Sequence, residues 1–144
     1  MTPTGHSRPF NSMLKYAYYH NRINSALRFI TQPGKRILLY GFHDGQLLHE
    51  LSPKPGYGID PHPQICKISK REFPDQTIIC TSFAKYRPTT TFDYVILNGA
   101  LGKTVDIMRL LQQIQRACHP LSRVIVYQHN HLWQGILTLA EALG

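Results

Sequence analysis

The chain has 144 residues, of which 42% are hydrophobic and 17% are charged, and its formal net charge is +8. This length suits one domain, because typical domains have roughly 100–200 residues, and no apolar run approaches the ~20 residues of a membrane-spanning helix. We therefore expect a single globular domain without a membrane span, and we expect it in the cytoplasm because the sequence shows no secretory signal segment.

Positive charge is concentrated in the first third of the chain, where no acidic residue precedes Asp44. Clustered cations fit a nucleic-acid or anionic-membrane surface, and an acid-free start with arginines also fits an organellar transit peptide. The cations are dispersed rather than consecutive, so a solvated face is favoured over a nucleic-acid partner. Cys66, Cys80 and Cys118 lack the paired spacing of metal or redox motifs, which predicts free, mostly buried thiols.

Residues 1–11 are mostly polar or turn-forming and predict a flexible tail, and residues 12–144 form the predicted domain. Apolar and aromatic side chains recur every three or four residues from Ser12 to Ile30, which predicts a basic N-terminal helix. Proline and glycine at Pro33 and Gly34 end this helix, because proline breaks the hydrogen-bond ladder and glycine accepts a left-handed cap.

Strands and helices are then predicted to alternate to the end of the chain. The short apolar runs that predict strands are residues 37–40, 56–60, 77–80, 92–97 and 123–127. The predicted helices lie around residues 47–51, 65–73 and 107–117, and the sequence Pro120-Leu121-Ser122 is expected to end the last of them before the fifth strand. Strands that are apolar on both faces indicate a parallel sheet covered by helices, so we predict a doubly wound α/β fold.

The candidate site lies where the first two strands end, because doubly wound sheets bind ligands at the carboxyl ends of their strands. Gly41 and Gly45 follow the first strand and allow close approach of a ligand, although a tight turn between strand and helix needs glycine anyway. Asp60 ends the second strand, where a carboxylate can accept both hydroxyls of a ribose, cap the following helix or form a turn. In combination these residues favour a nucleoside ligand.

Three segments together resemble the successive motifs of class I S-adenosylmethionine (SAM)-dependent methyltransferases: residues 37–45, 56–60 and 92–98. Residues 127–133 and 137–144 are similar to a bacterial branch of that family that is often joined to, or encoded near, glycosyltransferase domains. The resemblance covers residues 12–144. It implies a Rossmann-like sheet of order 3-2-1-4-5, SAM as the cofactor, and a small-molecule or glycan-related acceptor for the methyl group.

The resemblance also implies a cofactor site, position by position. Its residues are Gly41, Asp44, Gly45, Asp60, Ser82, Phe83 and Asn98. The glycine turn would run along the methionine and ribose portions of SAM, and Asp60 would accept the ribose hydroxyls. Ser82 and Phe83 would flank the adenine, and Asn98 would lie near the sulfonium.

Candidate catalytic residues follow the fifth strand at the same edge of the sheet. Tyr127, His129 and His131 stand there, and a neutral histidine can act as a general base toward an acceptor hydroxyl or amine. The two histidines are also compatible with an ordinary polar loop, or with a metal site, but no third ligand accompanies them, so no metal is predicted. Trp133 is expected to pack in a core or an interface rather than against the acceptor.

Three departures from the family pattern favour an alternative function. Leu39 stands where the family usually has an acid, His43 where it has a central glycine, and Ser82 where it has an acid that binds adenine. The alternative is a catalytically degenerate fold, a pseudoenzyme, that serves as an oligomerising binding or scaffolding module. A dehydrogenase domain binding NAD is less favoured, because the first turn lacks the complete GxGxxG spacing.

The end of the chain adds a prediction about partners. Class I methyltransferases usually carry two further strands after the fifth helix, and this sequence ends at Gly144, before they would begin. The predicted sheet therefore has an open edge strand, which is prone to pair with another chain. We expect a second copy or a partner chain to cover this edge.

Overall fold

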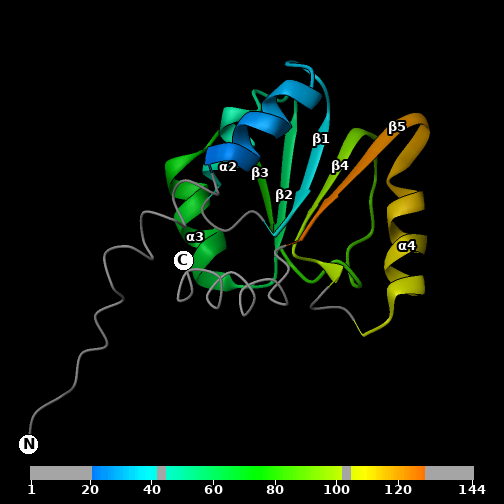
Figure 1. The fold of residues 1–144 in the computed structure, drawn as a ribbon. Helices are drawn as coiled ribbons and strands as arrows, with labels where there is room; N and C mark the ends of the chain where they lie inside the picture. The colour runs from blue at the N-terminus through cyan, green and yellow to red at the C-terminus, as the bar shows by residue number, and fades with distance from the viewer. Residues whose placement is uncertain (1–20, 42–44, 102–104, 129–144) are drawn as a thin grey trace, which may run out of the picture. The chain divides into compact units, whose positions relative to one another are not determined.

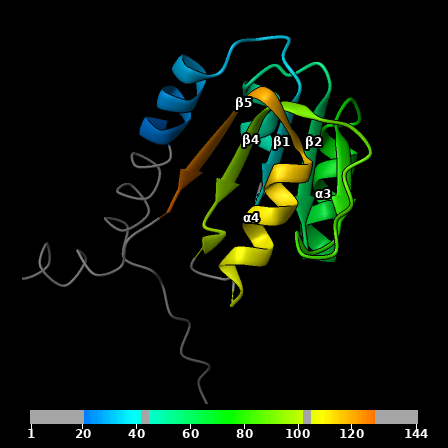
Figure 2. The ribbon, with the colours of Figure 1, turned by 90° about the vertical axis from the view of Figure 1, so that its right-hand side faces the viewer.

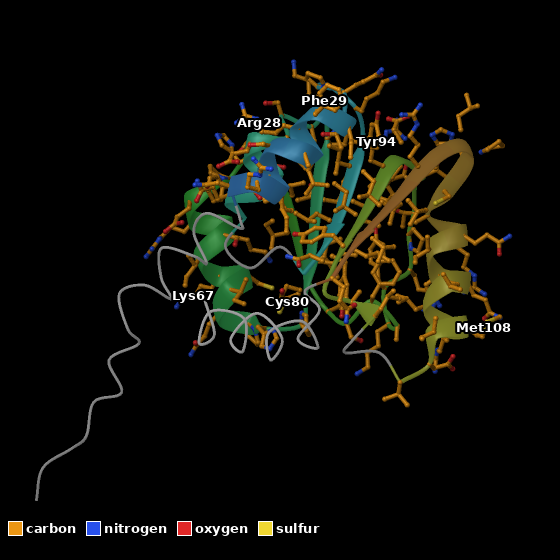
Figure 3. The ribbon with its side chains drawn as sticks, in the orientation of Figure 1. Arg28, Phe29, Lys67, Cys80, Tyr94 and Met108 are labelled. Carbon is orange, nitrogen blue, oxygen red and sulfur yellow. The ribbon has the colours of Figure 1, made fainter. Side chains whose placement is uncertain are left out.

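The computed structural model describes residues 21–41, 45–101 and 105–128, and the chain divides into two units, residues 1–32 and 33–144. In the first unit residues 21–30 are helical, which confirms the described part of the predicted N-terminal helix. Arg28 and Phe29, labelled in Figure 3, lie on this helix, and the Phe29 side chain is 92% exposed. The predicted tail of residues 1–11 lies outside the described residues.

The second unit is built on a five-stranded sheet in which every pairing is parallel (Figure 1). Its strands are β1 (Ile37–Tyr40), β2 (Gly56–Asp60), β3 (Thr77–Cys80), β4 (Phe92–Asn98) and β5 (Cys118–Tyr127). Their spatial order is β3-β2-β1-β4-β5, which confirms the predicted order. The direction of winding reverses between β1 and β4, which is the position where sheets of this kind bind ligands.

Helices cover both faces of the sheet. They are α2 (Gln46–Glu50), α3 (Pro63–Glu72) and α4 (Ile107–Arg116). Figure 1 shows α2 and α3 on one side of the strands and α4 on the other, and Figure 2 shows α4 in front of β4 and β5. This arrangement confirms the predicted doubly wound fold. No helix in the described part of the chain has the length and apolar character that crossing a bilayer requires.

The core lies around the two central strands. Leu38 and Leu39 of β1 and Val95 of β4 are fully buried, since helices cover both faces of these strands. The helix α4 adds Leu110 and Ile114, each 4% exposed. Ile107 and Leu111 of the same helix are each 48% exposed, so only part of the apolar side of α4 is buried against the sheet. Figure 3 labels Met108, also on α4, which is 67% exposed.

The predicted start of the fifth strand is wrong. The sequence Pro120-Leu121-Ser122 was expected to precede the strand, but β5 begins at Cys118 and contains the proline. The pairing of Phe92 with Cys118 is followed by that of Tyr94 with Arg123, so several residues of β5 bulge out opposite one residue of β4. Proline is tolerated in such a bulge, and in the described residues β5 is an edge strand that hydrogen-bonds only to β4.

Candidate functional site

Gly41, directly after β1, is held by the strands on either side of it. Gly41 has φ 75° and donates a hydrogen bond of 3.0 Å to the Ile59 carbonyl at the end of β2. On the other side the Asn98 side-chain amide donates a hydrogen bond of 2.8 Å to the Gly41 carbonyl. A Cβ atom at Gly41 would lie 2.5 Å from the Asn98 carbonyl oxygen. Glycine is therefore required at position 41 because the β4 backbone lies so close to it. The Asn98 side-chain amide is already hydrogen-bonded to the Gly41 carbonyl.

Gly45 also has a packing role. It adopts φ 82° at the start of α2, and a Cβ atom there would lie 2.9 Å from the Phe73 ring and 3.1 Å from Ser69. Glycine thus allows the chain to pass close to α3, independently of any ligand. Asp44, which was predicted to lie along the cofactor, and His43 are outside the described residues.

Asp60 is buried at the carboxyl end of β2. The residue is 3% exposed, and its Oδ1 accepts a hydrogen bond of 2.9 Å from the His62 backbone and lies 2.7 Å from His62 Nδ1. These contacts close the turn that leads into α3, so Asp60 has a turn-forming role, and α3 begins at His62 without a side-chain cap. A carboxylate has about four acceptor sites, so the turn does not exhaust the capacity of Asp60 to bind a ligand.

A cavity of about 270 Å³ opens at the same edge of the sheet. It is lined by Tyr40, Ser82, Phe83, Ala84, Val105, Asp106, Arg109 and Leu110. The rings of Tyr40 and Phe83 meet edge to face, with 5.2 Å between their centroids, and Phe83 is 2% exposed. Small-molecule sites usually enclose about 300–1,000 Å³, so this cavity lies just below the lower end of that range. Ser82 and Phe83, predicted to lie together, both line it.

Tyr40 links the cavity to Asp60. Burial raises the pKa of the Tyr40 phenol, a backbone hydrogen bond from Phe83 acts in the opposite direction, and the negative charge of Asp60 raises the pKa further. The phenol is therefore protonated at neutral pH and can donate a hydrogen bond at the cavity wall. The Asp60 carboxylate is close enough to the cavity for its charge to act on Tyr40.

The first turn of α4 contributes residues that the sequence analysis missed. Asp106 caps α4, since its Oδ1 accepts a hydrogen bond of 2.9 Å from the Arg109 backbone, and both residues line the cavity. The predicted site residues all end a strand or follow one closely, whereas Asp106 and Arg109 stand at the start of the next helix. The predicted topology could have indicated these two residues, because a helix that follows β4 must begin at the carboxyl end of the strands.

The end of β5 lies near the glycine turn. Tyr127 pairs with Asn98, and its carbonyl accepts a hydrogen bond of 3.0 Å from the Gly99 backbone. Tyr127 is thus brought to the same edge as Gly41, whereas the other candidate bases, His129 and His131, are outside the described residues, as is Trp133. Within the described ranges no group of three or more His, Cys, Asp or Glu residues is arranged to hold a metal ion.

Two of the departures from the family pattern can be located. Leu39 is fully buried between β2 and β4, so the first strand offers an apolar side chain at this position. Ser82 lines the cavity with a hydroxyl group in place of an acid. The described site therefore has one buried carboxylate, at Asp60, and a second carboxylate at the cavity, from Asp106 on α4.

Comparisons of the sequence with protein-family models and with curated proteins find no match. The structure does match solved structures. The plantazolicin methyltransferase BpumL, in a complex with S-adenosylhomocysteine (SAH), is 18% identical, with a TM-score of 0.69 over 89% of this chain and 57% of its own. A TehB-like SAM-dependent methyltransferase from Corynebacterium glutamicum is 18% identical, with a TM-score of 0.64 over 95% of this chain and 84% of its own.

A third match is a methyltransferase in a complex with the Haloferax volcanii methyltransferase activator Trm112, which is 20% identical, with a TM-score of 0.62 over 74% of this chain and 53% of its own. The present chain thus spans little more than half the length of two of these three structures. At these identities the similarity defines the fold, which is that of class I SAM-dependent methyltransferases.

Proposed function

We propose that this chain binds SAM and SAH and is a SAM-dependent methyltransferase-like protein acting on a small-molecule or glycan-related acceptor. The observation that carries this proposal is the occurrence of the buried Asp60 carboxylate at the end of β2 and of an aromatic-walled cavity at the same end of the sheet. A ribose needs a fixed acceptor for its two hydroxyls, and an adenine needs a flat apolar slot with polar groups at its rim. Solved structures of this fold that hold SAH, such as that of BpumL, support the choice of cofactor.

The residues of the cavity fit the adenosine portion of SAM. Phe83 and Leu110 provide apolar walls, and Ser82 and Asp106 provide polar groups for the edge of a base. Asp60 would accept the ribose hydroxyls, and the turn from Gly41 through Asp44 to Gly45 would run along the methionine portion, with Asn98 nearby. When bound, SAM supplies an activated methyl group, so the protein needs chiefly to hold the acceptor in line with it.

A general base is needed only if the acceptor is a protonated hydroxyl or amine. We propose Tyr127, His129 and His131 for this role, on the support of the Tyr127 position at the carboxyl end of β5 beside Asn98. The identity of the acceptor is part of the same proposal, and the resemblance of the segment after β5 to proteins associated with glycosyltransferases supports a glycan-related one.

The departures at Leu39 and Ser82 set an expectation for affinity. Each removes a charged acceptor, and a hydrogen bond to a charged group is worth about 1.5–3 kcal/mol. Since about 1.4 kcal/mol corresponds to a tenfold change in Kd, each loss weakens cofactor binding by about tenfold to a hundredfold. We therefore expect weaker SAH binding than in a site that has both acids.

Calorimetric titration with SAH tests the proposal. Asp60→Asn keeps an acceptor for the His62 backbone but removes the charge, so we expect it to weaken SAH binding about tenfold to a hundredfold. Asp93→Asn is the matched control, because this carboxylate lies near the start of β4, at the end of the strands opposite to Asp60. Equal affinities of the Asp60 variant and the wild type, or no SAH binding by the folded wild type, would refute the proposal.

A second candidate function rests on β5. In the described residues this strand is at the edge of the sheet, and the Leu121, Val124 and Val126 side chains are 85%, 44% and 45% exposed. We propose, as the alternative to catalysis, that this face joins a second copy or a partner chain in a scaffolding role. The complex of a similarly folded methyltransferase with Trm112 supports a partner of this kind.

Sedimentation velocity of the wild type and a Val124→Lys variant tests this alternative. Association at micromolar concentration that the variant loses supports it, and a wild-type monomer that captures no partner overturns it. Nucleic acid is the less favoured partner. Binding driven by phosphates must fall steeply between low and physiological salt, so binding that does not change with salt excludes it.

A further inference from the structure

Two of the three cysteines meet beside Asp60. Cys66 lies on α3, is 3% exposed, and donates a hydrogen bond to the Asp60 carbonyl with 3.3 Å between Sγ and the oxygen. Cys80 is the last residue of β3 and the register partner of Asp60 on β2. The Cys80 side chain also acts on the pKa of the Cys66 thiol, which places the two thiols close to each other.

The two thiols differ in accessibility. Both are free, Cys66 is buried and Cys80 is exposed, so the prediction that the thiols are mostly buried fails at Cys80. Figure 3 shows Cys80 toward the end of the sheet at which β1 and β5 finish. In such a pair a dissolved oxidant reaches the exposed thiol first, and the buried thiol can then displace the adduct. Cys118, the third cysteine, is partly exposed and begins β5.

We propose that Cys66 and Cys80 form a reversible disulfide that joins α3 to β3 next to Asp60. The oxidant is a low-molecular-weight disulfide. The Cys80 thiolate attacks one sulfur of the oxidant, forming a mixed disulfide and releasing one small thiolate. The Cys66 thiolate then attacks the Cys80 sulfur and releases the second. The two protein thiols lose two protons and two electrons, and the oxidant is reduced to two thiols.

The second step is the slow one near neutral pH. The pKa of the Cys66 thiol is raised to about 12, chiefly by burial. The neighbouring Cys80 and Asp60 raise this pKa further, and Lys70 lowers it. Only the thiolate attacks, and its fraction rises about tenfold for each pH unit below the pKa. The conversion of the mixed disulfide to the internal disulfide is therefore expected to accelerate by about tenfold per pH unit.

Oxidation also removes a contact of the proposed cofactor site. The disulfide has no S–H group, so the hydrogen bond from Cys66 to the Asp60 carbonyl is lost. This consequence rests on the proposed function, in which Asp60 holds the ribose. The Asp60 backbone is then held by one hydrogen bond fewer, and a carboxylate that is less well positioned binds the ribose more weakly. We therefore expect the oxidised protein to bind SAH more weakly, by at most the roughly fivefold change that one neutral hydrogen bond represents.

Intact-mass and peptide-mapping measurements on the full chain, treated with oxidised glutathione, test the disulfide. The wild type and the control Cys118→Ser are expected to lose two hydrogens and to give a peptide cross-linked between Cys66 and Cys80. Cys66→Ser is expected to keep a glutathione adduct on Cys80, because the resolving thiol is absent. A wild type that stays reduced, or that retains the adduct on Cys80 even at high pH, overturns the proposal.

SAH titration of the reduced and oxidised wild type separates this inference from the proposed function. If the reduced protein does not bind SAH, the proposed function fails, and the mass measurement still decides the disulfide. If the disulfide forms and the two redox states bind SAH equally, the link between the thiol pair and Asp60 is overturned.

Discussion

A Gly41→Ala substitution tests whether β4 dictates the turn after β1. The new methyl group would meet the Asn98 carbonyl oxygen at 2.5 Å, and the residue would keep a φ of 75°. The left-handed conformation costs about 1–2 kcal/mol for a residue with a Cβ atom, and a forced contact in a packed region costs about 1–3 kcal/mol. We therefore expect the free energy of unfolding to fall by about 2–5 kcal/mol.

Gly34→Ala is the matched control. Gly34 has φ 73° but nothing within 4 Å of the position of a Cβ atom, so this variant bears only the conformational cost of about 1–2 kcal/mol. Urea denaturation of both variants measures the difference, which isolates the contact with Asn98. Equal losses of stability in the two variants would refute the argument that β4 requires a glycine at Gly41.

Three further predictions concern single side chains. Phe83→Ala is expected to destabilise the protein by about 3–5 kcal/mol, because the ring is 2% exposed; a loss below about 1 kcal/mol in urea denaturation would contradict its role in the core. Asp106→Ala removes the cap of α4 and should cost about 1 kcal/mol, whereas Asp106→Asn should retain most of the stability. The Arg36 backbone hydrogen bond, with His119 and Lys35, lowers the pKa of Asp93, so the stability from Asp93 is present above the ordinary aspartate pKa and is lost as pH falls through the lowered one. Acid titrations of stability should flatten in Asp93→Asn, and superimposable profiles would contradict this.

The strands were predictable because their signals are local. Gly56–Asp60 and Thr77–Cys80 have the predicted bounds, since each is a short apolar run between turn-forming residues. The start of β5 was not predictable in this way. Pro120 normally marks a break, and only the pairing with β4, which determines the bulge, allows it inside an edge strand.

The candidate site was predictable as a location but not as a set of contacts. The position of Asp60 at the carboxyl end of the sheet was predictable, because the residue ends the strand β2. Sequence could not reveal that the Asn98 amide holds Gly41, because this contact joins residues 57 positions apart. The cavity residues on α4, such as Arg109, depend on how that helix is placed over the sheet, which no local pattern encodes.

The backbone contacts at Gly41 and Gly45 determine the shape of the candidate site, whereas its affinity for a cofactor depends on side chains. The Gly41 backbone is held by hydrogen bonds to β2 and from β4, and the close packing at Gly45 is set by α3, so contacts within the protein position both glycines. A site whose backbone is fixed by the fold can lose polar groups, as at Leu39 and Ser82, without losing its shape. The fold alone therefore does not distinguish an active methyltransferase from a degenerate one. Under the proposed function the distinction lies in the side chains that would meet the cofactor, and the SAH titration of Asp60→Asn tests the one that is buried and charged.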